Sequence, residues 1–566
     1  MSEAKKARRV AIFGMDGADF ALLRPWLEDN SLPCLARLYR NGAWGHLAST
    51  IPPYSPEAWT SFATGKNPGQ HGVVNFVQPK PGSYELVFST GATRRGKTFW
   101  QIAGEAGLSV GVINVPMTYP PQPVNGFMIS GADTPGPQSE FVYPKELKAE
   151  LLAAVGRYDL HGDYWGRTTP QEYLNRLIAT VENHARAWQY LIERHSPDLF
   201  IGVFGSTDRA QHFLWRYSDP AHPRYDGAEF GGKNPLLAVY QAVDKAIGEC
   251  LARLGDDVTV IIMSDHGGGP CNKAVYLDRW LQQQGLLVYK EEKQRLGGSL
   301  KRRGYELARA FLPRWAKDWA KAKWGEVRQQ IEGSLLLDPI DWEHTRAFFL
   351  GTESAYIYLN VAGRFPQGSI KPGREAEETS RRIAHDLAGL VDPESGEPVV
   401  ESVHLRGELY RGKLEELALL PDLVVNWRGG YVVRHAWGDS AAAPDVIIDP
   451  SLKAGEAGHL MSLELCCSHR PNGILILAGP DLPAGKEIAG ARIIDLAPSA
   501  LALLGVSVPA DMDGVVLAGL PQAEASLQQS SVEAPQQVEP APSADPYTEA
   551  EKQEMEQRLR ALGYLE

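Results

Sequence analysis

The chain has 566 residues, 43% hydrophobic and 22% charged, which excludes a disordered or fibrous protein and fits a large globular one. A formal net charge of −12 argues against a nucleic-acid duplex or an anionic membrane as the main partner. No run approaches the roughly 20 apolar residues of a membrane-spanning helix. The opening "MSEAKKARRVAIFGMDG" passes directly into a strand-like segment without an export signal, so we expect a cytoplasmic protein with no membrane segment.

The five cysteines are sparse, odd in number and without a Cys-x-x-Cys spacing. They predict a reducing compartment and no thiolate metal site. They are Cys34, Cys250, Cys271, Cys466 and Cys467.

Short, continuous apolar runs recur along the chain, and most are followed by glycine or polar turns and then helical patterns: "RVAIFGMDG", "LSVGVINVP", "DLFIGVFGSTD", "DVTVIIMSDHGGG" and "PNGILILAGP". Continuous hydrophobicity is typical of strands covered on both faces, so the pattern predicts an α/β fold with a mostly parallel central sheet. Functional groups of such sheets gather beyond the carboxyl ends of the strands. Asp16, Asp208 and Asp265 each follow such a run, and we expect them there.

Ser55 lies in "TIPPYSPEAWTSFATGKNPGQHG", just before Pro56 and a helix-like segment. A serine N-cap with proline at the first helical position is ordinary capping chemistry. The same arrangement aims a hydroxyl and several free N–H groups at one point, which suits an anion. Both roles remain open for Ser55.

Two later stretches combine an acid with a histidine. Asp208 and His212 are four residues apart in "TDRAQHFLW", so a helix would place both on one face, where such a pair usually decorates the surface. Asp265 and His266 are adjacent in "SDHGGG", which indicates either a turn or a metal site. Three strand ends that each supply a carboxylate favour the metal site.

The remaining segments predict one large domain over residues 1–520, with appendages. Residues 290–342 contain a Lys-, Arg- and Trp-rich helical insertion, read as a basic surface helix in preference to a substrate lid. Residues 521–546 predict a disordered linker. Residues 547–566 recover helical periodicity, and this C-terminal helix is expected to dock on the body or to mediate a homo-oligomer.

Five motifs in order, "GMDG", "SPEAWTSFATGKNPGQHGVVNF", "TDRAQH", "SDHGGG" and "SHRPNGILILAGP", resemble the alkaline phosphatase superfamily, and specifically its type I phosphodiesterase/nucleotide pyrophosphatase branch. The resemblance runs from about Arg9 to Leu520. It implies an alkaline-phosphatase-like sheet with helices on both faces.

The resemblance also implies two divalent metal ions, with zinc favoured over manganese. One ion would take Asp16, Ser55, Asp265 and His266. The other would take Asp208, His212 and a late histidine, assigned to His469 with His459 as the rival. Ser55 would attack phosphorus and form a phosphoseryl intermediate.

Two departures from the branch bear on the substrate. Ser55 stands where many members carry threonine, and the hydroxyl chemistry is equivalent. Diesterases of the branch carry an asparagine that binds a phosphoryl oxygen; here Phe76 stands at the matching position, and Asn75 precedes it by one residue. Asn75 is the candidate substrate-binding residue.

The sequence therefore predicts a metal-dependent hydrolase that cleaves a phosphodiester or a nucleotide pyrophosphate, acting on a small phosphate ester or nucleotide. A phosphomonoesterase of the same superfamily is the first alternative. A catalytically idle metal-binding interaction module is the second. His71 of the "HG" pair is expected to be structural, and Arg94 and Arg95 to be an exposed pair.

Overall fold

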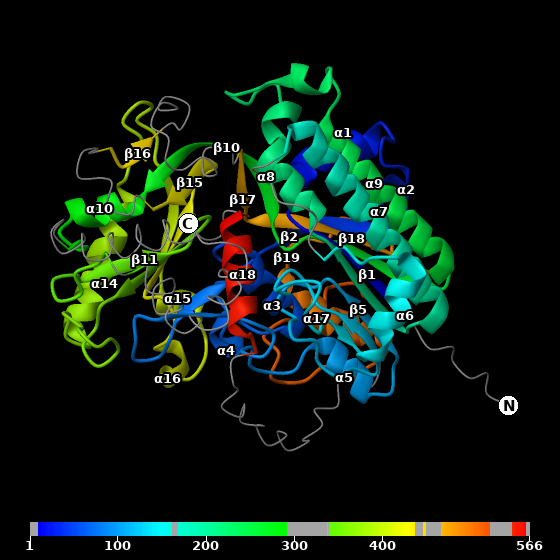
Figure 1. The fold of residues 1–566 in the computed structure, drawn as a ribbon, viewed down its shortest axis with the longest axis horizontal. Coiled ribbons are helices and arrows are strands. Elements are labelled where there is room, and N and C mark those ends of the chain that lie inside the picture. Colours follow the sequence, from blue (N-terminus) through cyan, green and yellow to red (C-terminus); the bar gives the residue numbers. More distant parts are fainter. Residues whose placement is uncertain are drawn as a thin grey trace, which may run out of the picture.

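The computed structural model describes residues 9–160, 168–290, 337, 339–435, 445–448, 466–480, 482–520 and 546–561. Most of the predicted insertion at 290–342 lies outside these residues, as do His459, the predicted linker up to residue 545 and the last five residues of the predicted C-terminal helix. The described chain forms a large α/β part and a smaller β-rich part, on the right and left of Figure 1.

A nine-stranded sheet forms the centre of the larger part, in the order β19–β2–β18–β9–β1–β8–β5–β6–β7. The central strands from β9 to β6 are parallel, whereas β18 is antiparallel to both of its neighbours and β7 to β6. Each of the five apolar runs forms a strand of this sheet, which confirms the predicted α/β fold. The strands are β1 (Arg9–Met15), β2 (Ala43–Ala48), β5 (Val110–Ile113), β6 (Gly126–Ile129), β7 (Val142–Tyr143), β8 (Leu199–Phe204), β9 (Val258–Met263), β18 (Asn472–Ala478) and β19 (Ala491–Arg492).

Helices cover both faces of this sheet, which explains why its strands are apolar without alternation. In β1, Ala11 and Phe13 pack into one hydrophobic core and Val10 and Ile12 into another on the opposite face. The helices of the first face are α1 (Phe20–Glu28), α2 (Pro33–Asn41), α6 (Glu146–Val155), α7 (Pro170–His195), α8 (Ser206–Ser218) and α9 (Pro235–Leu254). Those of the second are α3 (Ser55–Thr64), α5 (Phe99–Glu105) and α17 (Leu496–Leu504).

The smaller part has its own core around an antiparallel sheet of four strands, in the order β11–β12–β14–β13. These are β11 (Ala347–Leu350), β12 (Ala355–Leu359), β13 (Val400–Leu405) and β14 (Leu423–Trp427), packed against α14 (Arg374–Ala388). The shorter elements are α4 (Pro68–His71), β3 (Val77–Pro79), β4 (Leu86–Phe88), η1 (Gly227–Phe230), α10 (Leu277–Gln283), α15 (Arg406–Leu409), α16 (Leu414–Leu417), β15 (Gly430–Arg434), β16 (Ile447–Ile448) and η4 (Ile493–Asp495).

A long strand, β10 (Gly267–Tyr276), follows β9 almost directly and leads towards the smaller part. It pairs antiparallel with β17 (Cys467–Arg470), so that Gly268 lies opposite His469. This register brings a histidine from late in the chain to the carboxyl end of β9, next to His266.

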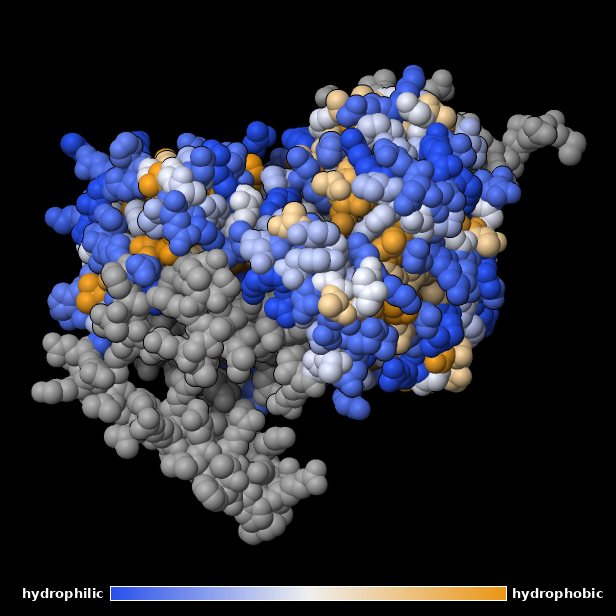
Figure 2. Space-filling view, turned by 90° about the horizontal axis from the view of Figure 1, so that it is seen from above, coloured by the Kyte–Doolittle hydropathy of each residue, from blue (hydrophilic) through white to orange (hydrophobic). Residues whose placement is uncertain are grey.

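The C-terminal helix α18 (Glu549–Ala561) lies between the two parts, as the red helix in Figure 1 shows. The face of the molecule seen in Figure 2 is mostly hydrophilic, with small groups of hydrophobic residues. No helix in the described ranges combines the length and the apolar composition that a bilayer crossing requires. All five cysteines are free.

Candidate active site

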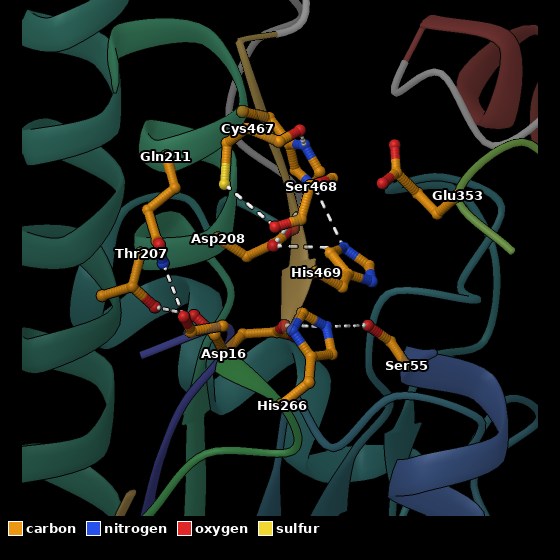
Figure 3. Close-up of polar contacts among 12 residues, drawn as sticks. Asp16, Ser55, Thr207, Asp208, Gln211, His266, Glu353, Cys467, Ser468 and His469 are labelled. Atoms are coloured by element: carbon orange, nitrogen blue, oxygen red, sulfur yellow. Dashed lines mark hydrogen bonds and ion pairs between the residues drawn. The ribbon is translucent and has the colours of Figure 1, made fainter. Parts of the chain in front are cut away.

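Three carboxylates meet where the central strands end. Asp16 follows β1, Asp265 follows β9, and Asp208 lies in the first turn of α8, which begins directly after β8. Because β1 lies between β8 and β9 in the sheet, their carboxyl ends are adjacent. All three side chains are buried, with 7%, 0% and 6% of Asp16, Asp265 and Asp208 exposed. Figure 3 shows Asp16 and Asp208 facing histidines of other elements.

Three histidines beside these carboxylates are oriented by the backbone. The Nδ1 atoms of His212, His266 and His469 lie 3.3, 3.0 and 2.9 Å from the carbonyl oxygens of Cys467, Gly267 and Pro53. A carbonyl oxygen can only accept, so each Nδ1 carries the proton and donates it. Each Nε2 then keeps a lone pair, the arrangement typical of metal-binding histidines.

The first group of candidate ligands consists of Asp208, His212 and His469, whose lone pairs lie close together. His212 Nε2 and His469 Nε2 are 3.1 Å apart, and Asp208 Oδ1 is 3.2 Å from the first and 3.6 Å from the second. Two lone pairs and a carboxylate at these distances repel one another unless a cation or a proton lies among them. The donor set of two imidazoles and a carboxylate suits a zinc-like ion.

The second group consists of Asp16, Asp265 and His266, whose potential ligand atoms all lie within 4.8 Å of one another. Within the described residues, Asp16 Oδ1 and Asp265 Oδ2 are buried without a hydrogen-bond partner. Buried carboxylate oxygens without donors are costly, and a divalent ion would satisfy them. His266 also groups with Asp208 and His469, so it lies between the two candidate sites.

The charges of the metal-free cluster are strongly perturbed. Burial, with the charges of neighbouring carboxylates, raises the pKa of Asp16 well above its usual value and that of Asp265 to about 7. Burial opposes ionisation of Asp208 too, but the charge and hydrogen bond of His212 outweigh it and lower its pKa. Burial and the charge of His266 hold the pKa of His469 well below its usual value. Asp16 and Asp265 therefore lack enough positive charge nearby to ionise readily, and metal ions would supply it.

Ser55 points at the same cluster from the opposite side (Figure 3). Its Oγ is 3.0 Å from His266 Nε2 and donates to it, because His266 Nδ1 carries the ring proton. Ser55 is the first residue of α3, with Tyr54 rather than Ser55 at the N-cap position and no side-chain capping bond. The hydroxyl is therefore turned to the ligand cluster and not back to its own helix.

Several residues that support the cluster were not predicted from the sequence. Trp59 Nε1 donates to Asp16 Oδ2 at 3.3 Å, and Thr207 Oγ1 donates to the Asp16 carbonyl oxygen at 2.6 Å. The backbone of Gly17 donates to Asp265 Oδ1 at 3.2 Å and has φ of 70°. A Cβ on Gly17 would lie 2.9 Å from Asp208 Oδ1, so this turn requires glycine.

Glu353 adds a buried carboxylate from the smaller part, on the His469 side of the cluster (Figure 3). Within the described residues, its Oε2 atom has no hydrogen-bond partner. Burial raises its pKa, although the charges of His212 and Arg434 oppose the shift. Nothing in the pattern around "GTESAY" distinguished this acid from an ordinary turn residue.

The other residues singled out in the sequence have different surroundings. Asn75 is buried, while Phe76 lines the cavity at the site. His71 is buried outside the cluster, where its Nδ1 accepts from the Val73 backbone and its Nε2 is 3.0 Å from Ser61 Oγ, consistent with a structural role. The expectation of an exposed arginine pair is wrong, because Arg94 and Arg95 are half-buried and donate to backbone carbonyls nearby.

A cavity lies beside the cluster, and the C-terminal helix contributes one residue to its wall. Its wall includes Ser55, Asp16 and Asp208 together with Leu559 of α18. The helix is held by Tyr547, which stacks on Tyr119 at 5.3 Å between ring centroids and donates to the Asp133 carbonyl oxygen at 2.8 Å. Buried Arg558 donates to the carbonyl oxygen of Thr134. The end of the chain thus contributes to the same site as its first strand.

Comparisons with known proteins show the family of the chain and its fold. Residues 10–451 match the family model described as type I phosphodiesterase/nucleotide pyrophosphatase. The chain belongs to this family. The predicted branch and the predicted class of enzyme, a phosphodiesterase/nucleotide pyrophosphatase-like hydrolase, are thereby confirmed. No curated protein matches the chain in sequence.

Solved structures of this fold include phosphonoacetate hydrolase from Sinorhizobium meliloti 1021 in complex with phosphonoformate. It is 16% identical, the match covers 88% of this chain and 96% of that one, and the TM-score is 0.53. The same enzyme with phosphonoacetate gives a TM-score of 0.52, with the same identity and coverage. Murine ectonucleotide pyrophosphatase/phosphodiesterase 5 with AMP is 12% identical over 89% and 96% of the two chains, with a TM-score of 0.47. The phosphonoacetate hydrolase match confirms the alkaline-phosphatase-like fold.

Proposed function

We propose that this hydrolase is a two-metal enzyme that cleaves a phosphodiester or a nucleotide pyrophosphate by attack of Ser55 on phosphorus. The observation that carries the proposal is the position of the Ser55 hydroxyl, 3.0 Å from His266 Nε2 and thus beside the residue shared by two groups of metal ligands. A neighbour of this fold binds phosphonoformate, a small phosphonate.

The chain supplies two sets of ligands for the metals. Asp208, His212 and His469 would hold one ion, and Asp16, Ser55, Asp265 and His266 would hold the other. When bound, two such ions neutralise charge on the phosphoryl group and lower the pKa of a hydroxyl. Zinc is favoured because imidazole and carboxylate ligands suit it, although manganese accepts the same ligand types.

The residues around the ligands keep this geometry fixed. Backbone carbonyls orient the three imidazoles, and Trp59 and Thr207 hold Asp16. Ser55 opens α3, so free backbone N–H groups of the first turn lie next to the hydroxyl and favour an anionic phosphoryl group there.

The reaction would proceed in two displacements. In the first, a bond forms between Ser55 Oγ and phosphorus while the bond from phosphorus to the leaving oxygen breaks; the serine proton passes to solvent and the leaving alkoxide takes one up. In the second, water attacks phosphorus, the bond to Ser55 Oγ breaks, and the serine hydroxyl is restored. The sum is the hydrolysis of one ester or anhydride bond.

One observation favours a phosphomonoester as the alternative substrate. Phe76, not an asparagine, lines the cavity beside Ser55, so the side-chain amide that diesterases of this family use is missing from that position. The idle-module alternative predicts bound metal without turnover.

The test combines metal content with a substrate panel. Elemental analysis is expected to find two divalent ions per chain. The metal-loaded protein is expected to hydrolyse bis-p-nitrophenyl phosphate or a p-nitrophenyl nucleotide faster than p-nitrophenyl phosphate, and Ser55→Ala to abolish this activity.

Ser61→Ala is the matched control, because Ser61 lies on the same helix, is buried and pairs with a histidine at the same 3.0 Å. Faster turnover of the monoester would move the function to a phosphatase. Two bound ions without turnover of any ester would favour the idle module, and a protein that holds no metal would refute the proposal.

A further inference from the structure

The cavity beside Ser55 contains a cation, Arg209, that no described residue pairs with. Arg209 follows the candidate ligand Asp208 on α8 and lines the same cavity as Ser55, Asp16 and Asp208. The side chain is half-buried, and no hydrogen bond or ion pair joins its guanidinium to any of the described residues. Arginine in an enclosed site normally has a carboxylate or phosphate partner, because its charge is costly to bury alone.

The carboxylates around Arg209 are engaged elsewhere. Asp208 Oδ1 lies 3.2 Å from His212 Nε2, and Asp159 accepts from Thr180 at 2.8 Å. His184 also lines the cavity, and burial, with a smaller effect from the charge of Arg209, lowers its pKa to about 4. At neutral pH His184 is therefore uncharged, whereas the guanidinium of Arg209 carries a positive charge.

The remaining wall limits what can enter. Leu160, Phe213 and Leu559 give it an apolar surface, and Leu559 belongs to the C-terminal helix α18. Tyr547 and Arg558 hold that helix in place, as described above. The cavity therefore suits a compact group with one charged end.

Given the proposed function, on which this inference rests, we propose that the cavity receives the organic part of the substrate and that Arg209 binds a second anionic group on it. That group is a carboxylate or a phosphate close to the reacting phosphoryl group. The bidentate guanidinium suits both. Because Arg209 is next to Asp208 on one helix, the distance between the two binding points is fixed by the fold.

The test uses phosphonates that cannot be hydrolysed, so binding is measured apart from turnover. Titration calorimetry with the metal-loaded full chain at constant ionic strength compares 3-phosphonopropionate with propylphosphonate, which differ in the terminal carboxylate. Ethane-1,2-diphosphonate replaces that carboxylate by a phosphonate. The wild type is expected to bind at least one of the two probes that carry a second anionic group about ten- to a hundredfold more tightly than propylphosphonate, the range for a charge-assisted contact. The better of the two identifies the anion.

Three variants test whether Arg209 causes the preference for a second anionic group. Arg209→Ala is expected to remove it while binding of propylphosphonate stays within about twofold, and Arg209→Lys to keep part of it. Arg186→Ala is the matched control, because Arg186 is an exposed arginine on the neighbouring helix α7 and its loss changes net charge alone. Should Arg209→Ala fail to fold, Arg209→Lys still tests the geometry through a weakened preference.

The role of Arg209 and the proposed hydrolase function can fail independently, and the results distinguish the two cases. A wild type without the preference, or an Arg209→Ala protein that retains it, overturns the role of Arg209 while the hydrolase proposal stands. If the wild type binds no phosphonate at all and hydrolyses no p-nitrophenyl ester, the proposed function fails and the inference fails with it.

Discussion

Removing the metal ions should make the stability of this protein depend on pH in a defined direction. In the metal-free protein, burial and the charge of Asp208 raise the pKa of Asp265 to about 7 from an ordinary value near 3.8. A raised carboxyl pKa means that the folded state prefers the protonated form. Its contribution to stability is fully present below pH 3.8 and is lost as the pH rises through 7.

The size of the effect follows from the shift. A change of about three pKa units corresponds to about 4 kcal/mol of unfolding free energy, of which somewhat more than half, roughly 2 to 3 kcal/mol, is lost between pH 5 and pH 8. His212 adds to the trend, because Asp208 outweighs its burial and raises its pKa to about 9, so its stabilisation declines above pH 6.5. Bound metal removes the pH dependence that comes from Asp265 and from His212, because both side chains are then metal ligands.

The assay is urea denaturation of metal-loaded and chelator-treated protein at pH 5 and pH 8. The gap in unfolding free energy between the metal-loaded and the metal-free protein should be wider at pH 8 than at pH 5, by roughly 2 to 3 kcal/mol or more. Asp133 is buried, burial raises its pKa to about 6, and it belongs to neither ligand group, so we expect its titration to be the same in both forms and to cancel in this difference. Asp265→Asn should reduce the pH dependence of the metal-free protein. A gap independent of pH, or an unchanged slope in Asp265→Asn, would refute the reasoning.

Three further outcomes are expected. Ser55→Ala should lower phosphoester hydrolysis by at least about a thousandfold while elemental analysis still finds metal, and loss of the metal instead would make Ser55 chiefly a ligand. His469→Ala should leave one bound ion in place of two, which a metal titration measures; two retained ions would show that another residue is the late ligand. Tyr547→Ala should speed hydrogen exchange across α18 by removing its stacking on Tyr119 and its hydrogen bond to Asp133, and unchanged exchange would mean that the helix is held by other contacts.

The sheet and the ligand carboxylates could be predicted because they depend on local patterns. A continuous apolar run followed by an acid predicts a strand that is covered on both faces and has a functional residue at its carboxyl end. Asp16 and Asp265 both follow such a run. Asp208 and His212 do lie on one helix, as their spacing predicted, but their burial follows from packing that spacing does not encode.

Other parts of the site depend on contacts between distant segments. The resemblance pointed to His469, but its place next to His266 comes from the pairing of β17 with β10. Helical periodicity predicted α18 without indicating that Leu559 would reach the cavity of Ser55. Arg94 was expected to be exposed because a pair of arginines usually is, yet it is half-buried and donates to the Met117 carbonyl oxygen and to the Gln122 side chain.

The central claim is that Ser55 becomes covalently attached to phosphorus during turnover. Acid quenching of the metal-loaded protein with a p-nitrophenyl ester, followed by mass spectrometry of the peptide that contains residue 55, tests it most directly. We expect Ser55 to be phosphorylated before steady state is reached, and no phosphate on this peptide of the Ser55→Ala protein. Hydrolysis that proceeds with phosphate on another residue, or on none, would contradict it.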